Sequence, residues 1–190
     1  MLFRPSTLLA TGVSLLFAQT AVCQITADQV ISNLNGLTGD AQALANTALT
    51  VDTASCLQLL GNTGPLFSII AQITAIDTTL DQVAAQMRTS PPITDADNAL
   101  AIFVAYRYFV RSLHTFLDDI IVRGCGASFC NVLINQRERV ATALLLLENS
   151  FAGYSRALLE LIPAQRDATE SNFELVYETA VQAAEIYDVA

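Results

Sequence analysis

Apolar side chains recur at alternating spacings of three and four along five long segments of the chain, and helix-breaking residues separate these segments. Such spacing places the apolar residues on one face of a helix, whereas a half-buried strand would alternate at every second residue. No segment has the pattern of a strand. Long helices joined by short breaks must bury their apolar faces against one another. The pattern therefore predicts an all-α protein, an up-and-down bundle of about five helices.

The apolar stripes run over residues 30–51, 66–87, 99–120, 140–161 and 173–187. Several boundaries have recognisable chemistry, since capping boxes begin helices and glycine or proline ends them. Thr26 and Gln29 have the capping-box spacing, and Asp167 with Glu170 predicts a similar start for the fifth helix. The other predicted boundaries are Gly64-Pro65, Ser90-Pro91-Pro92, Thr94 or Asp95, Gly124-Cys125-Gly126 and Pro163.

Two regions of the chain leave alternatives open. Gly36 and Gly39 fall inside the first predicted helix, where each costs up to about 1 kcal/mol, so this helix is expected to kink or fray. Residues 52–62 are predicted to form either a connector or a short helix.

The N-terminal residues 1–23 have the order of a secretory signal peptide. Arg4 comes first, an apolar stretch from Leu8 to Phe17 follows, and small residues lead to Cys23. The alternative is a buried N-terminal helix. No run of the chain reaches the 18 to 20 apolar residues that a membrane span requires. We expect a secreted, extracellular protein with one domain, residues 24–190.

The charge balance excludes some classes of partner. Without the signal segment, eight arginines face 18 acidic residues, a net charge of −10, and the chain has no lysine. This excess argues against nucleic acid and anionic lipid headgroups, which need a positive surface. Apolar residues make up 53% of the chain and charged residues 14%. That surplus indicates a large core or an apolar surface kept for a ligand.

Four cysteines are present, and their parity depends on the cleavage site. Cleavage after Cys23 leaves three cysteines, and cleavage after Ala21 leaves four. In an oxidising compartment we expect Cys125 and Cys130 to close a short loop as a disulfide, with Cys56 free or paired with one of them. A single histidine and no C-x-x-C spacing argue against a zinc site, and no other metal or cofactor is expected.

The polar residues do not predict an active site. His114 could pair with Asp118 one helical turn away, but Ser112 cannot meet them, because neighbouring helical positions point in different directions. Asp118 and Asp119 diverge for the same reason. No glycine-rich phosphate loop occurs. We therefore expect no enzymatic activity.

Arg107 and Arg111 stand one turn apart on a largely apolar predicted helix. Their like charges repel unless acids or an anion lie between them. One interpretation is pairing with Glu148, Glu160 or the acids of the last helix. The other is that an arginine holds a ligand carboxylate at the mouth of an apolar cavity.

The sequence resembles the fungal hydrophobic surface-binding protein A and cell wall galactomannoprotein family. The resemblance spans nearly the whole chain after residue 23. It is carried by Val30-Ile31-Ser32-Asn33-Leu34-Asn35-Gly36-Leu37, by Ile93-Thr94-Asp95-Ala96-Asp97, by Phe116-Leu117-Asp118-Asp119-Ile120, and by 151–163 with its ending Leu158-Leu159-Glu160-Leu161-Ile162-Pro163.

The resemblance implies a secreted helical bundle that adsorbs to hydrophobic surfaces and recruits extracellular hydrolases, with some relatives holding fatty acids in a cavity. It implies no catalytic residues. Wall-bound members carry a Ser/Thr-rich stalk and an anchor, which this sequence lacks. Association with the cell wall is therefore left open.

We predict a binder of lipids or hydrophobic surfaces, with a fatty-acid-like ligand. The alternative is a secreted bundle that inhibits or docks onto an extracellular enzyme, and a hydrolase is the least favoured reading. The residues predicted to line the ligand site are Ile73, Ile76, Leu80, Phe103, Tyr106, Arg107, Val110, Leu144, Phe151 and Tyr154.

Overall fold

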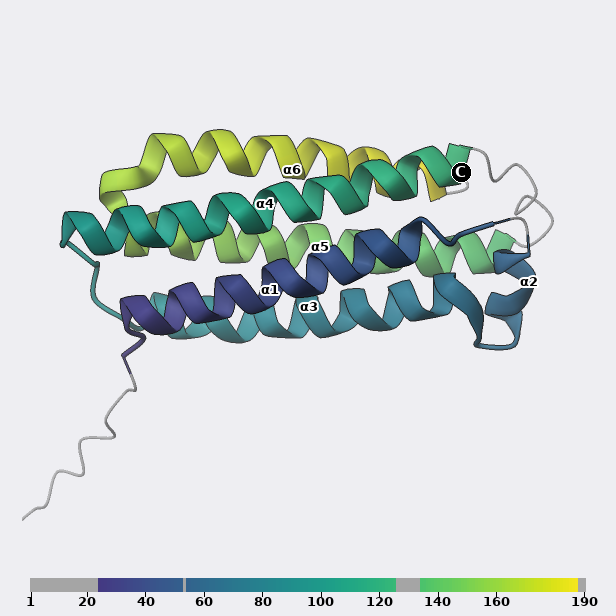
Figure 1. The fold of residues 1–190 in the computed structure, drawn as a ribbon, viewed down its shortest axis with the longest axis horizontal. Coiled ribbons are helices and arrows are strands. Elements are labelled where there is room, and N and C mark those ends of the chain that lie inside the picture. The colour runs from purple at the N-terminus through teal and green to yellow at the C-terminus, as the bar shows by residue number, and fades with distance from the viewer. Residues whose placement is uncertain (1–23, 53, 126–133, 188–190) are drawn as a thin grey trace, which may run out of the picture.

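The computed structural model describes residues 24–52, 54–125 and 134–187, and all regular structure in them is helical. In these residues five long helices and one short one make up the predicted bundle (Figure 1). A 3-10 turn, η2, covers Pro163–Gln165. The helices are α1 (Ala27–Ala48), α2 (Ser55–Leu60), α3 (Gly64–Arg88), α4 (Ala96–Cys125), α5 (Ile134–Leu161) and α6 (Arg166–Tyr187).

The long helices alternate in direction along the chain, but neighbours in space are not always neighbours in sequence (Figure 1). Helix α4 packs between α1 and α6, and α5 packs between α3 and α6. Contacts between α1 and α3 close the arrangement into a ring. Helices α1 and α4 therefore lie side by side and run in the same direction, which the periodicity does not reveal.

Most predicted helix boundaries are confirmed. The Thr26 hydroxyl accepts a hydrogen bond from the Gln29 amide at 3.3 Å, and the Gln29 side chain accepts one from the Thr26 amide at 2.9 Å, which completes the capping box. Asp95 accepts a hydrogen bond from the Asn98 amide and caps α4 in the same way. Residues 52–62, which were predicted to form either a connector or a short helix, contain the short helix α2.

Two details of the helices differ from what the sequence predicts. Helix α1 continues through Gly36 and Gly39 without a break, because its opposite face carries a row of fully buried leucines. At the other end of the chain, α6 begins at Arg166, within one residue of the predicted start, but Asp167 lies within the first turn and is not the capping residue. Glu170 instead lies 3.7 Å from the Arg166 guanidinium.

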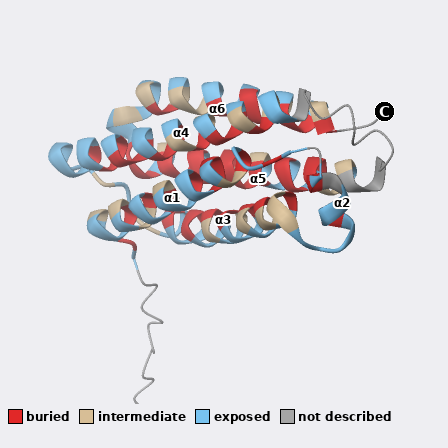
Figure 2. Ribbon diagram, turned by 45° about the vertical axis from the view of Figure 1, so that its right-hand side comes forward, coloured by how far each residue is buried: buried red, intermediate tan, exposed pale blue. Residues whose placement is uncertain are grey.

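The core lies along the axis of the ring. Figure 2 shows buried residues on the inward side of each long helix and exposed residues on the outward side. Every long helix contributes fully buried apolar side chains, and phenylalanine and tyrosine side chains are the largest of them. No helix within the described ranges is long and apolar enough to cross a membrane.

The predicted disulfide falls partly outside the described residues. Cys125 ends α4, whereas Cys130 lies beyond the described part of the chain. The signal segment, residues 1–23, also lies outside it. The disulfide and the signal peptide stay predictions.

Candidate functional site

Nine of the ten residues predicted to line a ligand site lie in one buried core. They come from three helices, α3, α4 and α5, and Phe103, the most exposed of them, is 8% exposed. The structure thus brings together side chains that are up to 81 positions apart in the sequence. Their part in binding stays a prediction. The nine residues are Ile73, Ile76, Leu80, Phe103, Tyr106, Val110, Leu144, Phe151 and Tyr154.

Aromatic rings join three helices at the centre of this core. The Phe151 ring on α5 stacks against Tyr106 of α4, with centroids 6.4 Å apart, and against Phe173 of α6 at 5.9 Å. Phe109 of α4 meets the same ring edge-on at 6.1 Å. Such ring pairs contribute about 0.5–1.5 kcal/mol each beyond the area they bury. Phe151 is therefore the central side chain of the interior.

Polar groups lie inside this apolar interior. The hydroxyls of Tyr106 and Ser155 form a hydrogen bond of 3.0 Å, and both residues are buried. The neighbouring Tyr154 hydroxyl is also buried, and no hydrogen-bond partner for it exists among the described residues. A buried hydroxyl without a partner costs about 1–3 kcal/mol. Such a group calls for an explanation, and a bound ligand that supplies the missing hydrogen bond would be one.

The two tyrosines remain neutral over a wide pH range. Burial raises the pKa of Tyr106 far above its ordinary value of 10.0, and the hydrogen bond to Ser155 offsets only part of this effect. Burial raises the pKa of Tyr154 as well, and the proximity of Tyr106 raises it further. Both phenols therefore act as neutral hydrogen-bond donors and acceptors, which suits a carboxyl group.

Ser155 was not among the predicted site residues. It stands four positions after Phe151 and directly after Tyr154, so it falls on the edge of the buried stripe of α5. A buried hydroxyl is costly unless it is hydrogen-bonded, so a serine at the edge of an apolar helical face predicts a polar partner. The periodicity could have identified the position, but the partner on α4 could not be inferred from spacing.

Arg107, the tenth predicted residue, lies apart from the other nine. It is exposed on α4, with its guanidinium 5.9 Å from the centre of the Phe103 ring. In the described ranges neither Arg107 nor Arg111 forms an ion pair, so the interhelical pairing with glutamates is not observed. Arg107 borders a surface hollow of about 190 Å³ together with Val104, Tyr108 and Arg111.

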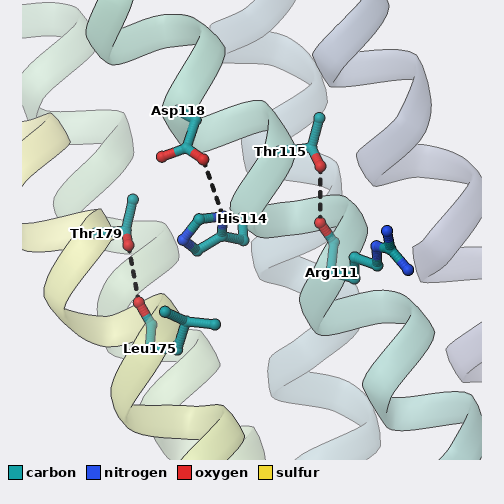
Figure 3. A network of polar contacts seen from close by, with 6 residues as sticks. All are labelled: Arg111, His114, Thr115, Asp118, Leu175 and Thr179. Carbon is teal, nitrogen blue, oxygen red and sulfur yellow. Dashed lines mark hydrogen bonds and ion pairs between the residues drawn. The ribbon is translucent and has the colours of Figure 1, made fainter.

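His114 and Asp118 form a pair on α4, with Nδ1 of the histidine 3.0 Å from the aspartate carboxylate (Figure 3). Ser112 lines a cleft between α4 and α1 instead. Figure 3 shows His114 and Arg111 leaving α4 on different sides. Neither His114 nor Asp118 lines that cleft, so the structure does not bring Ser112 to the histidine–aspartate pair.

Within the described residues, no group of three histidine, cysteine, aspartate or glutamate side chains is placed to hold a metal ion.

Comparison with known proteins found one similar structure and no matching sequence family. No protein-family model and no curated protein matches the sequence. The structure of Afmp4p in complex with palmitic acid resembles this one, with a TM-score of 0.68 and 16% sequence identity. The match covers 86% of this chain and 100% of the other. The chain therefore shares its helical-bundle fold with a protein that has been crystallised with a fatty acid.

At 16% identity the likeness supports a distant relation and does not establish a family. Membership of the family that the sequence resembles stays a prediction.

Proposed function

We propose that this protein is a secreted, non-enzymatic binder of long-chain fatty acids, and that the ligand occupies the interior of the helical bundle. The observation that carries the proposal is the Tyr154 hydroxyl, which is fully buried without a partner in an apolar core. The bound palmitic acid in a protein of the same fold supports it. Secretion is supported by the order of residues 1–23.

The proposed role of the interior follows from its chemistry. The apolar side chains of α3, α4 and α5 would surround the acyl chain, and each buried methylene would contribute about 0.8 kcal/mol before ordering costs. The hydroxyls of Tyr106, Tyr154 and Ser155 would receive the carboxyl group. An incoming chain must move core side chains, because the nine predicted lining residues are all buried in the free protein.

Native mass spectrometry of the purified protein with palmitic acid tests the proposal. We expect one fatty acid retained per chain, with occupancy reduced in Tyr154→Phe and unchanged in Tyr108→Phe. Tyr108 is a matched control because its ring is 61% exposed on the outer face of α4. Loss of one hydrogen bond from a buried carboxyl weakens binding about tenfold. No retained fatty acid in the wild-type protein would refute the proposal.

A second candidate function is adsorption to hydrophobic surfaces, and exposed apolar side chains at one end of the molecule favour it. Four large apolar side chains are exposed between the end of α1 and the start of α3, where α2 lies (Figure 1). Exposed apolar side chains offer contact area to a hydrophobic surface. We name this group the α2 end; it consists of Leu49, Leu57, Leu60 and Phe67.

A further inference from the structure

A cleft of about 600 Å³ runs between α1 and α4 on the outside of the bundle, and its lining combines polar side chains with apolar surface. Its volume lies in the range of small-molecule sites. The cleft is distinct from the apolar interior, because none of the nine buried site residues lines it. Its chemistry is set by Asn35, Gln42 and Asn46 on α1 and by Arg111, Ser112 and Thr115 on α4.

The cleft offers both hydrogen-bond donors and acceptors. The amides of Asn35, Gln42 and Asn46 make no hydrogen bond to other described side chains or backbone, so their donors and acceptors are available. The Thr115 hydroxyl already donates to the carbonyl of Arg111 at 3.0 Å. Its oxygen therefore remains available as a hydrogen-bond acceptor. A lining of this kind matches a ligand that carries several hydroxyl groups.

The charge in the cleft is positive, although the whole chain carries a net charge of −9. Arg111 is the one charged residue of the cleft lining, and it is shared with the smaller hollow that Arg107 borders. Two arginines one helical turn apart repel each other. Neither guanidinium has an acidic partner among the described residues. A carboxylate bound between them would relieve this repulsion and could accept paired hydrogen bonds.

An aromatic ring completes the arrangement. Tyr108 borders both hollows, and the residue is 61% exposed. An exposed tyrosine offers a rigid apolar face together with a polar hydroxyl. The Asp118 carboxylate pairs with His114 and lies on a different side of α4 from Arg111 (Figure 3), so it does not neutralise this surface.

We propose that the cleft between α1 and α4 binds a small sugar acid. Arg111, assisted by Arg107, holds the carboxylate, the amides of α1 bind the hydroxyls, and the sugar ring lies against Tyr108. A single carboxylate satisfies the two arginines, whereas a long polyanion would meet the acidic surface of the rest of the protein. This site does not depend on fatty-acid binding in the interior.

Isothermal titration calorimetry with galacturonate as the probe tests the site. We expect the wild-type protein to bind galacturonate, and Arg111→Gln to bind it at least tenfold more weakly. Arg156→Gln is the matched control, since Arg156 is an exposed arginine on α5 away from the cleft. This variant should bind galacturonate with the affinity of the wild type. Galactose, which lacks the carboxylate, should bind at least tenfold more weakly than galacturonate.

Two further measurements separate the parts of the proposal. Gln42→Ala should weaken galacturonate binding several-fold and leave acetate binding unchanged, because acetate has no hydroxyl groups. Tyr154→Phe should bind galacturonate as the wild type does, regardless of its affinity for palmitate.

The proposal is overturned if galacturonate fails to bind the wild-type protein, if Arg111→Gln binds it equally well, or if galactose binds as tightly. It is also overturned if palmitate displaces galacturonate and Arg111→Gln weakens palmitate binding. The cleft would then hold the headgroup of a fatty acid.

Discussion

The hydroxyls of Tyr106 and Ser155 meet at 3.0 Å in the buried centre of the bundle, and they link α4 to α5. The next residue along the chain, Tyr154, places a second phenol in the same apolar surroundings without a partner. The interior thus holds one hydroxyl pair that is hydrogen-bonded and one buried hydroxyl that is not. The account of fatty-acid binding rests on this pair of tyrosines.

Tyr154→Phe should stabilise the free protein. The substitution removes a buried hydroxyl that has no partner and keeps the ring in place, so the free energy of unfolding should rise by about 1 kcal/mol. Urea unfolding followed by circular dichroism measures this change. Tyr106→Phe is the comparison, because it breaks a hydrogen bond and leaves Ser155 unpaired; it should lower stability by about 1 kcal/mol. A loss of stability in Tyr154→Phe would contradict the prediction.

Stability should fall steeply at alkaline pH. The pKa of both buried tyrosines is raised in the folded protein, mainly by burial, whereas in the unfolded chain it is near 10.0. Below pH 10 both tyrosines keep their protons in the folded and in the unfolded protein, so the free energy of unfolding is not reduced. Above pH 10 only the unfolded state loses them, so each tyrosine removes up to about 1.4 kcal/mol per pH unit.

Urea unfolding at pH 9, 10 and 11 checks this dependence. The double variant Tyr106→Phe/Tyr154→Phe should lose less stability across this interval than the wild type. Tyr108→Phe, on the exposed face of α4, should follow the wild type. Identical pH dependence in the double variant and the wild type would show that these phenols do not cause the effect.

Gly36→Ala and Gly39→Ala should each stabilise α1. Both glycines lie within the continuous helix, and a Cβ atom at either position meets nothing within 4 Å. Alanine restricts the unfolded chain and favours the helix, so each substitution should add about 0.5–1 kcal/mol to the free energy of unfolding. Thermal unfolding measures the gain. Gly64→Ala is the opposing control and should destabilise, because Gly64 has a φ of 80° and a Cβ atom there would lie 2.2 Å from the Gln58 side chain.

Leu57→Gln/Leu60→Gln should reduce adsorption to hydrophobic beads. Both leucines are more than half exposed at the α2 end, so the substitutions remove apolar contact area at little cost in stability. Depletion of protein from solution by octyl-coated beads measures adsorption. Leu145→Gln/Leu146→Gln, on the exposed side of α5, is the matched control and should adsorb as the wild type does. Equal loss in both double variants would mean that adsorption has no particular site.

The sequence allowed the helices to be predicted better than their arrangement. The capping chemistry of Thr26 and the prolines near Ser90 act locally, so they place helix ends from sequence alone. Periodicity shows which face of a helix is buried but not which helix covers it. For that reason the contact between α1 and α4, and with it the cleft between these helices, emerged only from the structure.

The candidate site was predictable to a similar degree. Tyr106, Phe151 and Tyr154 stand on the apolar stripes, so spacing alone placed them in the core. The meeting of Tyr106 with Ser155 depends on the packing of two helices, and the absence of an ion pair at Arg107 depends on where the acids of other helices fall. Both are tertiary properties, which local spacing cannot supply.

The most direct test of interior binding is an isotope-filtered NMR experiment that records contacts between ¹³C-labelled palmitate and the protein. The account predicts cross-peaks from the ligand to the ring protons of Tyr106, Phe151 and Tyr154. Cross-peaks confined to Tyr108 or to the leucines of the α2 end, with none to the buried rings, would contradict it.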